Sequence, residues 1–264
     1  MTIQVGVLTE GTASSSFLRI LPNMFGGRSV ARLSVADLTD SAKLSSLSMI
    51  VLPGIDGEDS PYSRILEGRA GTNILSHAEK GGILWSSCAP TYALCRSTEY
   101  HASNGTVKTR KGLGIIDADA TGPVDRVDAL APKRQDRFAQ LRCVPVTFEV
   151  MGAEPTKIRA RLPYGNGPAM NGCQESEIMV RFGTDYDEGP GAIVLKRHGN
   201  GLVIASGILP ELGLSETQAY AANGRQFTHV ARMARELAPN EKRRQIITRR
   251  IRALCLAHHN FAIG

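Results

Sequence analysis

The chain has 264 residues and a net charge of +6; 42% of its residues are apolar, 21% are charged and 5% are aromatic. This size and apolar share predict one globular domain over residues 1–264 and exclude a disordered chain. Five cysteines, an odd number without a C-x-x-C pair, exclude a disulfide framework and a cysteine-rich zinc site. We expect a cytoplasmic protein with no signal peptide, membrane span, metal or cofactor, since no apolar run approaches the roughly 20 residues that cross a bilayer.

The N-terminal half alternates short apolar runs with helical segments. Strands are expected at residues 3–8, 30–33, 49–52 and 83–85. Helices are expected at residues 14–21, 62–67, 73–80 and 89–96. The run at 49–52 is continuously apolar and ends at Pro53-Gly54, which is typical of a parallel strand buried on both faces. This alternation predicts an α/β fold with a doubly wound, mainly parallel sheet and helices on both faces.

The second half is less regular. Residues 103–140 are polar and rich in Gly, Pro, Asp and Lys, so long loops are expected there. Further strands are predicted at 140–150, 157–162 and 176–182, followed by a hairpin that joins 192–196 to 202–206 through His198-Gly199-Asn200-Gly201. Two helices, at about 226–237 and 241–257, are expected to end the domain.

Much of the positive charge lies in the last predicted helix. Its basic residues are Lys242, Arg243, Arg244, Arg249, Arg250 and Arg252. They alternate with Ile and Leu at helical spacing, which is typical of a helix that docks through an apolar stripe and leaves a basic face in water. No nucleic-acid-binding motif accompanies it, so we expect no nucleic-acid partner. Contact of this face with nucleic acid or an anionic partner is the alternative left open.

Two segments are expected at the carboxyl edge of the parallel strands, where open α/β sheets bind ligands. One is Gly54-Ile55-Asp56 and the other is Cys88, which falls at a strand-to-helix turn. A thiol in the first turn of a helix feels the positive end of the helix dipole, which lowers its pKa. The backbone N–H of Ala89, with that of Gly54 or Ile55, would supply an oxyanion hole. The competing interpretation is a small cysteine packed at a helix start.

Four motifs, taken in order over residues 1–211, resemble the biotin-protein-ligase N-terminal-domain family, a branch of the class I glutamine amidotransferase-like superfamily. They are Val51-Leu52-Pro53-Gly54-Ile55-Asp56 followed by Pro61-Tyr62, Gly81-Gly82 leading to Cys88-Ala89-Pro90-Thr91-Tyr92, Tyr164-Gly165-Asn166-Gly167-Pro168, and the strand from Gly199 to Gly207. The resemblance implies a flavodoxin-like fold and a Cys–His–Glu triad in which the thiolate attacks an amide carbonyl. It does not imply ligase activity.

The chain lacks the general base of this triad. Cys88 and Glu211 match the family's nucleophile and acid, but Leu209 stands where the family has histidine. Ile55 and Pro90 replace family glycines, which restricts the backbone and narrows the pocket. Ordinary glutaminase activity is therefore doubtful on the sequence. By the same resemblance, the pocket is expected to include Asp56, Tyr92, Tyr164, Asn166 and Leu209.

Glu10 and the six histidines are the remaining candidates for the missing base. Glu10 follows the first strand at the correct edge of the sheet, and some relatives in the wider superfamily pair their cysteine with a glutamate from this loop. His101 would need its loop to fold back, and His198 lies at the far end of its strand. His77 and His229 are expected on helix surfaces, and His258-His259 in a solvated tail.

Two hypotheses follow from these residues. The first is a thiol-dependent amide hydrolase of non-standard mechanism, with Cys88, Glu211 and Glu10 as catalytic residues. The second is a catalytically inactive amidotransferase-like module that binds a small ligand or a partner protein. In both, the expected ligand is a small amide or an amino-acid-like molecule.

Overall fold

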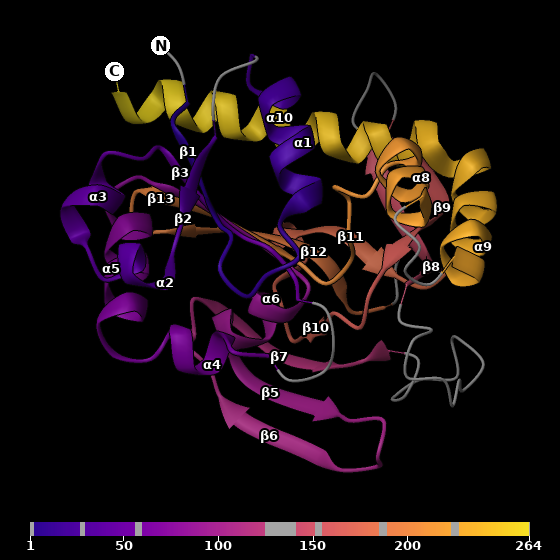
Figure 1. Ribbon diagram of the computed structural model, residues 1–264, viewed down its shortest axis with the longest axis horizontal. Helices are drawn as coiled ribbons and strands as arrows, with labels where there is room; N and C mark the ends of the chain where they lie inside the picture. The colour runs from indigo at the N-terminus through magenta and orange to yellow at the C-terminus, as the bar shows by residue number, and fades with distance from the viewer. Residues whose placement is uncertain are drawn as a thin grey trace.

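The computed structural model describes residues 3–26, 30–55, 60–124, 141–150, 155–184, 189–222 and 227–263. Within these ranges one mixed sheet runs through the molecule, with helices on both of its faces (Figure 1). Its strands are β1 Val5–Leu8, β2 Ala31–Leu33, β3 Met49–Leu52, β4 Ile83–Ser87, β5 Cys95–His101, β6 Val107–Lys111, β7 Ile116–Gly122, β8 Arg142–Val150, β9 Thr156–Tyr164, β10 Ala169–Asn171, β11 Ile178–Phe182, β12 Gly191–His198 and β13 Gly201–Ser206.

The α-helices are α1 Ser15–Met24, α2 Val35–Leu38, α3 Ser41–Ser45, α4 Tyr62–Ile65, α5 Gly68–Glu79, α6 Ala89–Leu94, α8 Leu214–Ala222, α9 Phe227–Leu237 and α10 Glu241–Ile263. The predicted α/β class is confirmed. Among the described helices, none combines the length and the apolar character that a membrane span requires.

One half of the sheet is parallel, in the order β2-β1-β3-β4-β13. Its strands carry the continuous apolar runs seen in the sequence, and every residue of β3 is buried. Met49 and Val51 pack with α1 and α10 on one face, while Ile50 and Leu52 pack with α5 and its neighbours on the other. Apolar side chains on alternating faces therefore hold helices on both sides of these strands.

The other half is largely antiparallel, so the expectation of a mainly parallel sheet is wrong for the sheet as a whole. β12 pairs with β13 in the predicted hairpin and is followed by β10, β7, β5 and β6, while β11, β8 and β9 branch from β12. Long loops were expected over residues 103–140, but this segment contains the strands β6 and β7. Its last part, 125–140, lies outside the described residues. The helix that starts after Cys88 ends at Leu94, and β5 follows at once.

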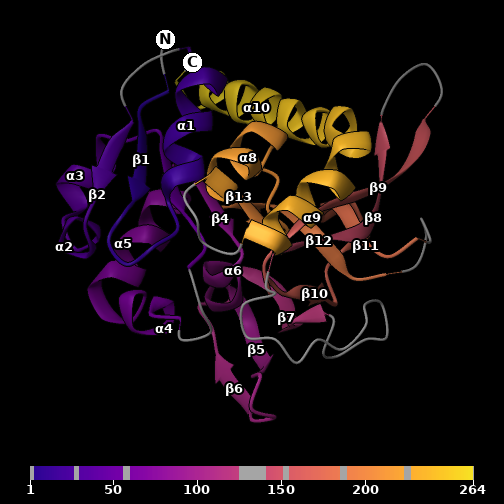
Figure 2. The same ribbon diagram turned by 45° about the vertical axis from the view of Figure 1, so that its right-hand side comes forward.

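The C-terminal helix α10 runs beside α1 along one side of the molecule (Figure 2), and its apolar stripe packs on the core, as predicted. Ile247, Ile251 and Cys255 are buried in the core, and the exposed basic residues are Lys242, Arg243, Arg249 and Arg252. Two expectations are corrected. Arg244 is buried, and its guanidinium donates to the Pro210 carbonyl at 2.5 Å and pairs with Glu241 at 2.6 Å. His258 and His259, which were expected in a solvated tail, instead lie in the last turns of α10. Both are buried beside Gly81, which lies just before β4.

Candidate functional site

Cys88 lies between β4 and α6 in a backbone conformation that few residues other than glycine adopt. Its φ is 66° and its ψ is −115°. A non-glycine residue at positive φ is strained, and such strain is concentrated at functional sites because the surrounding structure must hold it. Here the Cys88 N–H donates to the Ser206 carbonyl on β13 at 2.7 Å. Cys88 therefore lies on a sharp strand-to-helix turn, an elbow that follows the carboxyl end of β4.

The segments that the sequence placed beside Cys88 do meet it. A Cβ atom on Gly54 would lie 3.2 Å from the Cys88 Cβ and 3.7 Å from its Sγ, so a side chain at position 54 would press on Cys88. The backbone N–H of Ala89 points at the thiol, and Ile55 lines the same pocket. Gly54 and Ala89 therefore lie beside the sulfur, and Ile55 lies in the same pocket. Asp56 lies outside the described residues.

The environment of Cys88 favours the protonated thiol. Its Sγ donates to the Gly165 carbonyl at 2.9 Å, and the residue is 5% exposed. Burial raises the pKa of Cys88 to about 12, the nearby charge of Glu211 adds to this, and the Ala89 N–H lowers it. The expectation of a lowered pKa is wrong, because the cost of burying a thiolate outweighs the dipole of a helix of six residues.

Glu211 is buried behind the elbow. Its Oε1 accepts a hydrogen bond from the Ser87 hydroxyl at 2.9 Å, and the residue is 2% exposed. Burial raises the pKa of Glu211 to about 7, against the opposing effects of its own backbone N–H, of Ser87 and of Arg244. The carboxyl therefore bonds to the residue before Cys88.

Leu209 fills the place where the resemblance expects a histidine. It is 6% exposed, and its N–H donates to the Pro163 carbonyl at 2.8 Å. A Cβ on Gly165 would lie 3.1 Å from Leu209 Cδ1, so the leucine packs against the residue whose carbonyl accepts the hydrogen bond from the thiol. We call Ser87, Cys88, Leu209 and Glu211 the elbow cluster.

No histidine with a described side chain lines the pocket at Cys88. His77 lies on α5 and its ring is buried against Gly82, which corrects its expected surface position. His101 ends β5 and pairs with Glu99 at 2.7 Å. The side chain of His229 lies outside the described residues. None of the described imidazoles is therefore placed to take a proton from the thiol.

Glu10 is exposed and caps a helix. Its Oε2 accepts a hydrogen bond from the Val35 N–H at 2.8 Å, in the first turn of α2. It is not among the described residues that line the pocket at Cys88.

The turn from Tyr164 to Pro168 forms a second side of the site. The Tyr92 hydroxyl donates to the Asn166 carbonyl at 3.0 Å, and Asn166 has a φ of 67°. Tyr164 is fully buried and its hydroxyl donates to the Gly167 carbonyl at 2.8 Å. Tyr92 and Asn166 therefore face the pocket, whereas Tyr164 supports the turn from behind.

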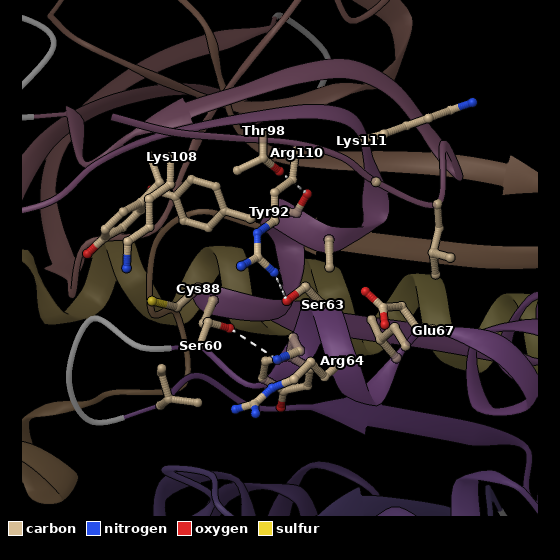
Figure 3. Close-up of a pocket in the computed structure, with 18 of the residues that line it drawn as sticks. Ser60, Ser63, Arg64, Glu67, Cys88, Tyr92, Thr98, Lys108, Arg110 and Lys111 are labelled. Atoms are coloured by element: carbon tan, nitrogen blue, oxygen red, sulfur yellow. Dashed lines mark hydrogen bonds between the residues drawn. The ribbon is translucent and has the colours of Figure 1, made fainter. Parts of the chain in front are cut away.

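A pocket of about 1180 Å³ opens beside Cys88 (Figure 3). Its walls come from the end of β3, from α4, α5 and α6, from the β5–β6 hairpin and from the turn at Asn166. Sequence reasoning missed Arg64, Lys108 and Arg110 in this lining. A signal was present, since Lys108 and Arg110 are two residues apart and such residues share one face of a strand.

A family model described as "Biotin-protein ligase, N terminal" matches residues 12–260, and that family is related to the glutamine amidotransferase-like superfamily. The search of curated proteins gave no match. Among solved structures, the exo-β-1,4-mannosidase Op5Man5 from Opitutaceae bacterium strain TAV5 is 12% identical, with a TM-score of 0.37, and the match covers 89% of this chain and 35% of that one.

For the β-galactosidase from Bacillus circulans sp. alkalophilus, the identity is 12% and the TM-score 0.37, over 78% of this chain and 29% of that one. The chain thus spans about a third of the length of these two enzymes. A putative ThuA-like protein from Bacteroides uniformis ATCC 8492 is 10% identical, with a TM-score of 0.38, and the match covers 90% of this chain and 92% of that one.

Proposed function

Since the chain belongs to the biotin-protein ligase N-terminal family over residues 12–260, we propose that it is an amidotransferase-like module that binds a small ligand at Cys88 without hydrolysing it. The strand order β2-β1-β3-β4-β13 supports a flavodoxin-like core, because the parallel strands follow one another as 2-1-3-4-5. In such a core the ligand lies at the carboxyl edge of the strands, which is where the pocket opens.

The buried thiol of Cys88, whose Sγ donates to the Gly165 carbonyl at 2.9 Å, is the observation that carries this proposal. Burial raises the pKa of Cys88 to about 12, which disfavours the thiolate. Amide hydrolysis needs the thiolate and a group that takes the proton and returns it to the leaving amine. Leu209 cannot do this, and the Gly165 carbonyl that accepts the thiol hydrogen bond is not a base.

A thiol-dependent hydrolase is the second candidate, and the strained backbone of Cys88 is the observation that favours it. A small buried cysteine has no need of a φ of 66°. The N–H of Ala89 also remains beside the sulfur, where an oxyanion donor would be required. For this candidate, a group supplied by the ligand or by a partner protein would have to act as the base.

The two candidates are separated by ammonia release. Wild type and Cys88→Ala would each be incubated with L-glutamine, L-asparagine and simple primary amides. The proposal expects the two proteins to release ammonia at the same background rate. Turnover in the wild type that Cys88→Ala lacks would contradict it. An NMR titration of both proteins with L-glutamine completes the test, because a binding module should keep its ligand-induced shifts when the sulfur is removed.

A further inference from the structure

One wall of the pocket is built from a single face of the β5–β6 hairpin. In the antiparallel register, Thr98 pairs with Arg110 and Tyr100 pairs with Lys108. Residues two apart on a strand share a face, so these four side chains stand on the same side of the hairpin. All four line the pocket that contains Cys88. We call Thr98, Tyr100, Lys108 and Arg110 the hairpin wall.

The charge of the pocket lining is one-sided. Four of its residues are cationic, namely Arg64, Lys108, Arg110 and Lys111, whereas Glu67 is its one carboxylate among the described residues. Figure 3 shows the Arg110 guanidinium directed into the pocket and bonded to Ser63, while Lys111 points away. Arg64 reaches the same space from α4, on the opposite side. Cations from two separate elements therefore converge on one cavity.

Protection of a sheet edge does not account for this arrangement. β6 is an edge strand, and charged side chains on such a strand discourage pairing with another chain. Side chains directed into open water would be enough to protect the edge. Edge protection therefore does not explain why Arg110 bonds to Ser63 on α4 across the pocket, nor why Arg64 also lines the pocket.

The remaining lining suits the body of an organic molecule. Its apolar and aromatic members are Ile55, Tyr62, Leu66, Leu75, Tyr92, Tyr100 and Leu113. Ligand sites combine such surfaces with a few polar groups that fix orientation. The planar fork of an arginine matches a carboxylate or a phosphate with two parallel hydrogen bonds. Apolar surface next to two guanidinium groups therefore fits a small molecule with an apolar body and an anionic group.

We propose that the pocket binds a small organic anion, whose carboxylate or phosphate lies between Arg64, Lys108 and Arg110. The proposal rests on the proposed function, because it names the class of ligand for the same pocket. Cys88 then lies deeper in the site, against the body of the ligand.

The test is an NMR titration with three probes of similar shape: phenyl phosphate, benzoate and neutral benzamide. At about pH 8 phenyl phosphate is doubly charged, because the second pKa of such an ester is about 6. Affinity should fall in the order phosphate, carboxylate, amide. In Arg64→Gln/Arg110→Gln the affinity for phenyl phosphate should fall about tenfold while that for benzamide is unchanged. High ionic strength should weaken only the anions.

Arg249→Gln is the matched control, because Arg249 is an exposed cation on α10, away from the pocket. It should bind phenyl phosphate as the wild type does. The proposal is overturned if benzamide binds as tightly as phenyl phosphate, if phenyl phosphate does not bind, or if Arg249→Gln weakens binding as much as the pocket variant.

Cys88→Ala is titrated in parallel and should keep the preference for anions. If the wild type proves to hydrolyse amides and this preference persists, the non-hydrolytic function fails and the anion site stands. If the preference is missing and no Cys88-dependent hydrolysis is found, the anion site fails and the binding module stands.

Discussion

The elbow cluster and the hairpin wall meet at one pocket, which is lined by Cys88 of the first and by all four residues of the second, but they treat charge in opposite ways. In the elbow cluster, burial raises the pKa of Cys88 to about 12 and that of Glu211 to about 7, so burial favours the neutral form of each group. Lys108 and Arg110 of the hairpin wall are cationic side chains exposed at the surface. The buried side therefore sets the state of the thiol and the stability of the fold, whereas the exposed side sets which ligands are attracted.

The largest effect is expected from Gly207→Ala, which adds a methyl group next to the elbow cluster. A Cβ on Gly207 would lie 1.9 Å from the Pro168 carbonyl oxygen, and this backbone atom cannot rotate away. We expect Gly207→Ala to lower the free energy of unfolding by about 3 kcal/mol or more, measured by urea denaturation.

Gly165→Ala is the matched control for that substitution. Its new Cβ would meet only the side-chain ends of Leu209 and Leu141, at 3.1 and 3.3 Å, and both can shift. We expect a loss below about 1 kcal/mol. An equal loss in the two variants would mean that the packing around the elbow is not limited by backbone contacts.

Glu211 should make stability depend on pH. Because its pKa is raised to about 7 in the fold, the native state keeps a proton that the unfolded chain loses above about pH 4.5. Stability should fall as pH rises from about 4.5 to about 7 and then level off, with a total change on the order of 3 kcal/mol.

Glu211→Gln removes the titrating group and keeps its shape. The variant should match the wild type at about pH 4.5 and be more stable at about pH 8, in urea melts at each pH. Glu10→Gln is the control, since Glu10 is an exposed capping residue, and it should keep the wild-type profile. If Glu211→Gln kept the full pH dependence, the carboxyl would not be the group responsible.

Leu209→His would place an imidazole where the elbow cluster lacks a base. Leu209 and Cys88 both contact Gly165, so the ring would lie beside the thiol. An adjacent base favours the thiolate, and reaction of Cys88 with a neutral disulfide should speed up about tenfold. Leu209→Met widens the site without adding a base and should have little effect. A similar gain in both variants would point to access rather than to proton transfer.

The hairpin wall should tolerate substitution. Lys108 is an exposed residue on an edge strand. We expect Lys108→Gln to change the free energy of unfolding by less than about 0.5 kcal/mol, because substitutions of exposed surface residues usually have small effects. A loss as large as that of Gly207→Ala would erase the contrast between the two sides of the pocket.

The sequence predicted the parallel half of the sheet because burial on both faces leaves a visible trace. Continuous apolar runs such as Met49–Leu52 have few alternatives to a central strand. Strand β6 left no such trace, since all five of its residues are exposed and Val107–Lys111 reads as a polar loop. Its pairing depends on β5 across a turn that local sequence does not reveal as a hairpin.

The candidate site, too, was predicted only in part from the sequence. The motifs predicted that four residues lie near Cys88, namely Gly54, Ala89, Tyr92 and Asn166. The structure places all four near it. The pKa of the thiol was predicted in the wrong direction, because the dipole of α6 can be read from the sequence whereas the depth of burial cannot. The contact between Glu211 and Ser87 depends on two segments more than a hundred residues apart.

The pKa of Cys88 tests the account most directly. Its reaction with iodoacetamide would be followed by peptide mass spectrometry across a pH series in which circular dichroism shows the fold intact, with the unfolded chain as reference. We expect slow labelling that keeps rising with pH beyond about 8.5, the pKa of a free thiol. A plateau reached below about pH 8 would show an activated thiolate and contradict the account.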